Sequence, residues 1–186
     1  MRYIVRGMSS RQPCILYLKS LLPQAEFMID VHGNAMAGFL CALRVSGADA
    51  VVHMEEDVII TSNFTKKIES VISKYPNNVI QFFSMRDKDI TVGSRYEPGR
   101  TFCMGQCFYL PAGYSAAVLK YWDRWPNKTR HPTGLDLMVG DFLKSRGEKY
   151  LISVPSLVNH RCTRSLIDPR RSSKRGARVF IDGVPG

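Results

Sequence analysis

Short apolar runs alternate with amphipathic stretches through the first half of the chain. Runs of strand length, flanked by turn residues, fall at residues 3–5, 27–29, 50–54 and 79–83. Apolar side chains recur at helical spacing over residues 11–22, 34–45 and 62–75. This alternation predicts an α/β fold in which helices flank a mostly parallel, Rossmann-like central sheet.

The second half begins with a break in this pattern. Residues 84–100 form a polar stretch that predicts a long loop, able to close over a substrate. Beyond it we expect a strand, two helices and a last strand, at residues 102–110, 112–125, 135–145 and 150–154. The total of 186 residues fits one domain, which we place at residues 1–168, followed by a basic tail at residues 169–186.

Three carboxylates, Glu55, Glu56 and Asp57, directly follow the third apolar run. On an extended backbone Glu55 and Asp57 point to the same side, and Glu56 points away. Because crowded like charges repel, a divalent cation is their natural partner, and carboxylate oxygens suit Mg²⁺ or Mn²⁺. Ligands of parallel sheets bind beyond the carboxyl ends of the strands, where this triplet is expected. The alternative is a solvated acidic turn whose charges favour the start of the next helix.

The chain is strongly basic, with a formal net charge of +10. Residues 161–178 contain seven basic residues and one acid. This cluster predicts attraction to polyanions such as nucleic acid, anionic lipid or nucleotide phosphate. A solubilising surface tail explains the same cluster equally well.

Five cysteines at irregular spacing indicate no disulfide framework and favour a reducing compartment such as the cytoplasm. A zinc site built from Cys103, Cys107, His160 and Cys162 is a minor alternative, because the spacing of Cys103 and Cys107 is not that of a usual zinc knuckle. Residues 1–10 lack the apolar centre of a signal peptide, and no apolar run is long enough for a transmembrane segment. The oligomeric state stays open.

Three segments together resemble the GT-A class of glycosyltransferases. The acidic D-x-D region, the strand beneath the acceptor site and the segment with the metal-binding histidine are similar to residues 50–64 (AVVHMEEDVIITSNF), 105–110 (GQCFYL) and 155–160 (PSLVNH). The resemblance implies a single GT-A-like domain that transfers a sugar from a nucleotide sugar with the help of Mn²⁺ or Mg²⁺. It implies Asp57 as the main metal ligand, His160 as a further ligand, and Glu55 bound to the metal or to the donor. Glu56 stands where aspartate is usual and joins the donor-binding residues, so the division of roles within the triplet stays open.

The short length, the basic charge and the opening RYIVRG (residues 2–7) are most similar to the TET/JBP-associated glycosyltransferases of phages and some eukaryotes. That resemblance implies transfer of glucose from UDP-glucose to a 5-hydroxymethyl-pyrimidine in DNA. For a phage-encoded chain the site of action would be the host cytoplasm.

Donor contacts are expected in the turn after the first strand. There Gly7 permits close approach of the backbone, and Arg6 or Arg11 can meet phosphate. Asn34 follows the second strand and is either a further donor contact or the N-cap of its helix. In the resembled class an acid near the start of the helix at 135–145 faces the acceptor. As the base that takes the acceptor proton we choose Asp136, with Asp141 as the second choice.

Two other functions remain open at this level. A glycosyltransferase acting on lipopolysaccharide or another glycan would direct the basic tail to an anionic membrane. A non-catalytic nucleic-acid-binding domain would use the acidic triplet only as a solvated turn.

Overall fold

The computed structural model describes residues 1–161, 165–166 and 175–182. Its centre is a seven-stranded sheet, in the order β2 (Glu26–Asp30), β1 (Arg2–Met8), β3 (Val51–Glu55), β7 (Cys107–Leu110), β5 (Ile80–Gln81), β8 (Lys149–Ile152) and β6 (Arg95–Pro98). The strand pairings set β7 and β6 antiparallel to their neighbours, while the other strands run in one direction. The expected α/β fold with a mostly parallel central sheet is confirmed.

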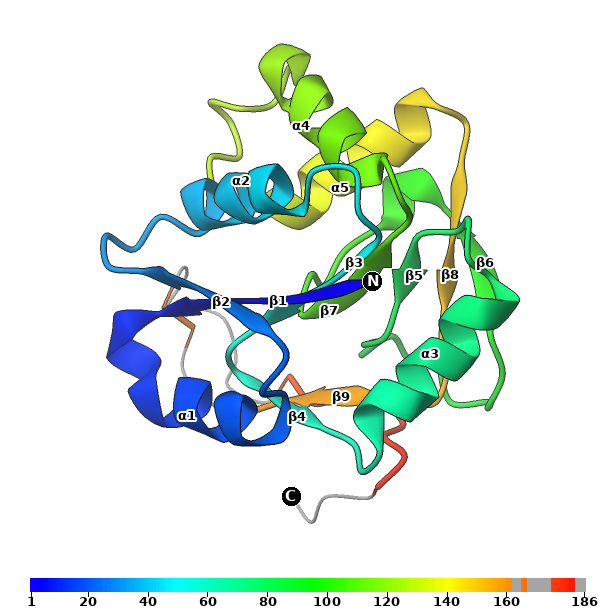
Figure 1. Ribbon diagram of the computed structural model, residues 1–186. Coiled ribbons are helices and arrows are strands. Elements are labelled where there is room, and N and C mark those ends of the chain that lie inside the picture. The colour runs from blue at the N-terminus through cyan, green and yellow to red at the C-terminus, as the bar shows by residue number, and fades with distance from the viewer. Residues whose placement is uncertain (162–164, 167–174, 183–186) are drawn as a thin grey trace.

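Helices cover both faces of this sheet (Figure 1). On one face lie α2 (Ala35–Ser46), α4 (Tyr114–Arg124) and α5 (Leu135–Ser145), and on the other lie α1 (Gln12–Leu21) and α3 (Phe64–Lys74). Alternate residues of β3 enter the two apolar cores, with Val51 in the core beside α2 and with Val52 and Met54 in the core beside α1 and α3. Both faces of β3 are therefore buried, which explains its almost uninterrupted apolar sequence.

A second, two-stranded sheet lies beneath the central one (Figure 1). Here β4 (Val58–Ile60) pairs antiparallel with β9 (Val158–His160), and Val58 stands opposite His160. The backbone N–H of Arg161 also donates to the carbonyl of Asp57 at 2.8 Å. The sequence patterns predicted neither strand. Their pairing fixes the end of β9 beside the acidic triplet.

The predicted loop at residues 84–100 contains β6, which forms an edge of the sheet beside β8. A polar edge strand such as RYEP lacks the apolar alternation by which strands are recognised. Side chains of the loop are held in place, with Arg86 Nη2 2.7 Å from the hydroxyl of Tyr150 and Arg95 Nε 2.6 Å from Asp89 Oδ1. The expected strand at 102–110 starts only at Cys107, after a 3₁₀ turn, η2 (Gly99–Thr101).

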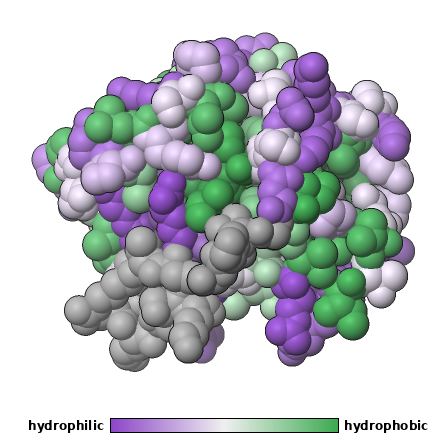
Figure 2. All heavy atoms as spheres, turned by 90° about the horizontal axis from the view of Figure 1, so that it is seen from below, coloured by the Kyte–Doolittle hydropathy of each residue, from purple (hydrophilic) through white to green (hydrophobic). Residues whose placement is uncertain are grey.

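Part of the expected basic tail packs against the domain. The backbone N–H of Ala177 donates to Asn159 Oδ1 at 2.7 Å, and that of Arg178 donates to the carbonyl of Ser84 at 2.9 Å. Residues 167–174 and 183–186, which complete the predicted tail, lie outside the described residues. Figure 2 shows the lower face of the molecule, where polar and apolar side chains are mixed in the visible part.

The four cysteines that the structure describes, Cys14, Cys41, Cys103 and Cys107, are free thiols. Cys162, the remaining member of the minor zinc alternative, lies outside the described ranges. Within those ranges no helix is long and apolar enough to cross a membrane.

Candidate functional site

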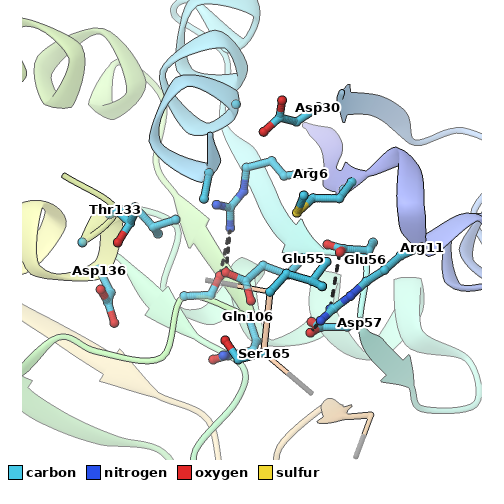
Figure 3. A pocket seen from close by; sticks show the side chains of 18 of the residues that line it. Arg6, Arg11, Asp30, Glu55, Glu56, Asp57, Gln106, Thr133, Asp136 and Ser165 are labelled. Atoms are coloured by element: carbon cyan, nitrogen blue, oxygen red, sulfur yellow. Dashed lines mark hydrogen bonds and ion pairs between the residues drawn. The ribbon is translucent and has the colours of Figure 1, made fainter. Parts of the chain in front are cut away.

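A cavity of about 800 Å³ opens at the carboxyl edge of the sheet. Because β1, β2 and β3 are parallel, their last residues meet at this edge, with Met8 directly opposite Asp30 in the strand register. Met8, Asp30 and Glu55 all line the cavity. The sequence-based expectation that ligand-binding residues follow the strands therefore agrees with the position of the cavity (Figure 3).

The floor of the cavity is the segment that leads into β7. Arg6 Nη2 donates to the carbonyl of Gly105 at 3.0 Å, and the backbone N–H of Glu55 donates to the carbonyl of Gln106 at 2.9 Å. Met104 has a left-handed backbone (φ 66°), and its N–H lies 3.2 Å from Asp136 Oδ2. One short segment thus connects the candidate base to the residues of β1 and β3.

All three carboxylates of the triplet line the cavity. Glu56 was expected to point away from Glu55 and Asp57, and this expectation was wrong. Strand β3 ends at Glu55 and the chain turns at residues 56–57, so the alternation of an extended strand stops there. Burial has the largest effect on the pKa of Glu55, and it outweighs the charge of Arg6, which acts in the opposite direction. Together with the neighbouring acids, burial raises this pKa from 4.5 to about 7.

Arg11 and His160 both contact Asp57. The guanidinium of Arg11 forms an ion pair with Asp57 Oδ2 and lies 3.4 Å from Glu56 Oε1. His160 Nε2 lies 3.2 Å from the same Asp57 oxygen. Burial acts to raise the pKa of Asp57. The hydrogen bonds and charges of His160 and then of Arg11 outweigh burial, so the pKa of Asp57 is lowered. Burial acts to lower the pKa of Arg11, but the charges of Asp57 and Glu56 outweigh it and raise this pKa.

Arg6 is a second cationic side chain at the cavity. Its side chain is buried, it lies 3.9 Å from Glu55 Oε1, and its guanidinium sits 5.1 Å from the centre of the Phe39 ring. Behind it, His53 is fully buried between Phe39 and Phe108. Burial, with the charge of Arg6 added, lowers the pKa of His53 well below its ordinary range, so His53 is neutral beside the arginine.

The residues at Asp57 suit a hard divalent cation in their chemistry. Asp57 Oδ1 is buried and has no hydrogen-bond partner within the described residues, and an imidazole nitrogen stands beside the other carboxylate oxygen. Carboxylate oxygen and imidazole nitrogen are ligands that Mn²⁺ accepts. In the described part of the chain, however, no group of three or more His, Cys, Asp or Glu side chains is arranged as a metal site. Arg11 already pairs with Asp57 Oδ2, so a cation held by both this oxygen and His160 Nε2 requires Arg11 to move.

The opposite wall of the cavity comes from residues 130–137, which lead into α5. Asp136 lies in the first turn of α5 and faces the cavity, as predicted. Asp141 does not line it. Its Oδ2 accepts hydrogen bonds from Trp125 Nε1 at 2.8 Å and from Asn127 Nδ2 at 2.9 Å. Asp141 therefore anchors the segment between α4 and α5, and Asp136 remains the candidate base.

Gly7 and Asn34, two predicted donor contacts, have different places. Gly7 lines the cavity, and a Cβ added there would lie 2.9 Å from Glu56 Cβ, so the site requires glycine. Asn34 is the N-cap of α2, accepting a hydrogen bond from the N–H of Ala37 at 2.9 Å, and is not among the lining residues. Of the two interpretations of Asn34, the structure supports the cap.

The sequence patterns missed several lining residues. Asp30 ends β2, and its Oδ2 is buried with no hydrogen-bond partner in the described ranges. Its position after a parallel strand was the available signal. Arg130 and Arg175 also line the cavity. Arg175 belongs to the basic cluster at residues 161–178, which predicted attraction to polyanions, but only the tertiary fold brings it and Arg130 to this cavity.

The loop at residues 84–100, expected to close over substrates, contributes no residue to the cavity among those described. Its β6 lies at the far edge of the sheet from β1 and β2. Two arginines of this loop, Arg86 and Arg95, hold the loop to β8 and to itself.

Comparison with known proteins gives a fold and no family. No protein-family model matches the chain, and no curated protein matches it significantly. The fold is similar to that of A197 from STIV, with a TM-score of 0.53 and 15% identity over 100% of this chain and 97% of that one. A Bacillus anthracis protein assigned as a glucose-1-phosphate thymidylyltransferase, in complex with a sucrose, has a TM-score of 0.47 at 14% identity over 85% of this chain and 69% of that one. The likeness to A197 shows a shared fold, so the chemistry must be argued from the cavity.

Proposed function

We propose that the chain is a metal-dependent glycosyltransferase that transfers glucose from UDP-glucose to the hydroxyl of a 5-hydroxymethyl-pyrimidine in DNA. The observation that carries this proposal is the meeting of Asp57, His160 and Glu55 with two arginines in one cavity at the strand ends. The arginines suit the phosphates of a nucleoside diphosphate, and the carboxylates and the imidazole suit its metal counter-ion. The cavity volume of about 800 Å³ is in the range of sites for small ligands.

The donor would lie along the ends of β1, β2 and β3. Asp57 and His160, with Glu55, would hold a Mn²⁺ or Mg²⁺ ion, which when bound neutralises the leaving diphosphate. Arg6 adds a fixed positive charge on the floor of the cavity. Asp30 Oδ2, which has no hydrogen-bond partner among the described residues, would accept a hydrogen bond from the nucleoside.

Asp136 acts from the opposite wall. Its carboxylate would take the proton of the acceptor hydroxyl as the oxygen attacks the anomeric carbon. The bond from that carbon to the diphosphate oxygen breaks, and its electron pair leaves with the diphosphate. The hydrogen bond from Met104 N–H to Asp136 Oδ2 would keep the carboxylate oriented during the transfer.

The choice of DNA as acceptor is supported by charge. The chain carries a net charge of +10, and Arg130 and Arg175 line the same cavity as Asp136. Arginines at such a position favour a polyanion, and a modified base would have to leave the duplex to reach the cavity.

The test is incubation with UDP-glucose, Mn²⁺ and DNA with or without 5-hydroxymethyl-cytosine, followed by mass spectrometry of the nucleosides. The proposal predicts one added hexose on the modified base, and none with Asp57→Asn. Hydrolysis of UDP-glucose without a mass gain on any DNA would remove DNA as the acceptor and favour a glycan. Retention on DNA with no hydrolysis or transfer would favour a non-catalytic binding domain.

A further inference from the structure

Arg11 contacts Asp57 Oδ2, the oxygen that a divalent cation shared between Asp57 and His160 would need. Its side chain is only 12% exposed, and it neutralises Asp57 and Glu56 together. The Asp57 oxygen that it contacts is the one that also faces His160 Nε2. A cation bound between Asp57 and His160 would therefore lie directly against the guanidinium.

We propose that Arg11 is a built-in counter-ion, which a divalent cation must displace from Asp57 and which then binds the diphosphate of the donor. The inference rests on the proposed function, because it requires that this cavity binds a cation and a nucleoside diphosphate.

Electrostatics explains why Arg11 and the cation exclude each other. Two positive charges on one buried carboxylate oxygen repel strongly, because little water is present to screen them. Without either cation, Glu56 and Asp57 would be two buried like charges that have lost their guanidinium partner, which is strongly unfavourable even with His160 beside Asp57. Arg11 therefore stabilises the metal-free protein, and the metal can replace it.

The two arginines of the cavity differ in their partners and in the elements that carry them. Arg6 lies on β1 with its guanidinium bound to the Gly105 carbonyl and packed near the Phe39 ring. Arg11 is the last residue of a short 3₁₀ turn, η1 (Ser9–Arg11), and its side chain runs along the cavity to the carboxylates (Figure 3). A small rotation of this long side chain keeps it within the cavity. Its planar group suits two oxygens of a phosphate.

This arrangement couples the two ligands. A cation alone must break the Arg11–Asp57 ion pair, so it binds weakly. A nucleoside diphosphate offers the guanidinium a new partner, so the two bind more tightly together than separately, and the coupling is reciprocal.

The experiment measures Mn²⁺ binding without nucleotide, by electron paramagnetic resonance of free Mn²⁺, in the wild type, in Arg11→Gln and in Arg146→Gln. Arg146 pairs with Glu148 away from the cavity and controls for the loss of one positive charge. We expect Arg11→Gln to bind Mn²⁺ about tenfold more tightly than the wild type, and Arg146→Gln to match the wild type. Equal affinity in all three proteins overturns the role of Arg11 and leaves metal dependence standing. Absence of Mn²⁺ binding in all three overturns both proposals.

Thermal unfolding gives a second measurement, because Arg11→Gln leaves the carboxylates without their counter-ion. We expect this variant to be less stable than the wild type and to gain more from Mn²⁺. If it folds only when Mn²⁺ is present, the metal has replaced the guanidinium as proposed. If it stays unfolded in Mn²⁺, the metal does not take over the position of Arg11 and the proposal is wrong.

Discussion

His160 Nε2 lies 3.2 Å from Asp57 Oδ2, although more than a hundred residues separate the two along the chain. The pairing of β4 with β9 produces this contact, since Val58 stands opposite His160 in the register. Backbone hydrogen bonds therefore fix the position of an imidazole beside a carboxylate. The pair therefore belongs to the architecture of the fold, and both residues line the cavity.

The role of Asp57 can be tested with Asp57→Asn, which keeps the size of the side chain and removes its charge. We expect metal-dependent hydrolysis of UDP-glucose to fall at least about 100-fold, as when a stabiliser of developing charge is lost. Asp49→Asn is the matched control, because Asp49 is 65% exposed and lies outside the cavity. Unchanged hydrolysis in Asp57→Asn would contradict the assignment.

Two glycines of the cavity wall should respond in opposite ways to alanine. At Gly7 the new Cβ would lie 2.9 Å from Glu56 Cβ and force that side chain away from Arg11. We expect Gly7→Ala to lower the free energy of unfolding by about 1–3 kcal/mol. At Gly38, within α2, a Cβ meets nothing within 4 Å, so Gly38→Ala should raise it by about 0.5–1 kcal/mol. Urea denaturation measures both, and a shift of the same sign in both variants would argue against this packing.

Substitution of Asp136 should affect mainly catalysis, and substitution of Asp141 should affect mainly stability. Asp141→Ala removes the acceptor of the buried Trp125 indole and should cost about 1–3 kcal/mol of unfolding free energy. Asp136→Asn should lower kcat for transfer while shifting the unfolding midpoint much less. Steady-state kinetics and denaturation on both variants decide between the roles. A larger loss of kcat in a stably folded Asp141→Ala protein would reverse them.

The ligand-free protein should lose stability as the pH rises from about 4.5 to about 7, through Glu55. Its pKa is about 7 in the folded protein, above its value of 4.5 in the unfolded chain. The contribution of Glu55 is therefore fully present below about pH 4.5 and is lost as the pH rises through about 7. The midpoint of thermal unfolding, measured from pH 5 to pH 8, should fall more steeply in the wild type than in Glu55→Gln. Parallel curves for the two proteins would show that Glu55 is not perturbed.

The periodicity of the sequence predicted most of the fold, because long helices and buried strands leave strong local patterns. The same reasoning placed Glu55 and Asp57 at the cavity, since residues after parallel strands share one edge of a sheet. Asp136, which also lines the cavity, was chosen from the resemblance to the GT-A class. It could not detect β6, a polar edge strand whose stability comes from pairing with β8.

The contacts that give the site its character depend on tertiary structure. No local pattern indicates that Arg11 reaches Asp57 across the sheet edge, or that Asp141 accepts a hydrogen bond from Trp125. Glu56 was misjudged because the alternation rule holds only while the strand continues, and β3 ends one residue earlier. Charge and hydrogen-bond partners therefore had to come from the three-dimensional arrangement.

The most direct test of the central claim is a crystal of the protein soaked with MnCl₂ and UDP, with data collected at the manganese absorption edge. The account predicts an anomalous peak between Asp57 and His160, with the UDP diphosphate next to it and the Arg11 guanidinium turned from Asp57 toward phosphate. A map with Arg11 still on Asp57, no manganese peak in the cavity and UDP absent from the strand ends would contradict it.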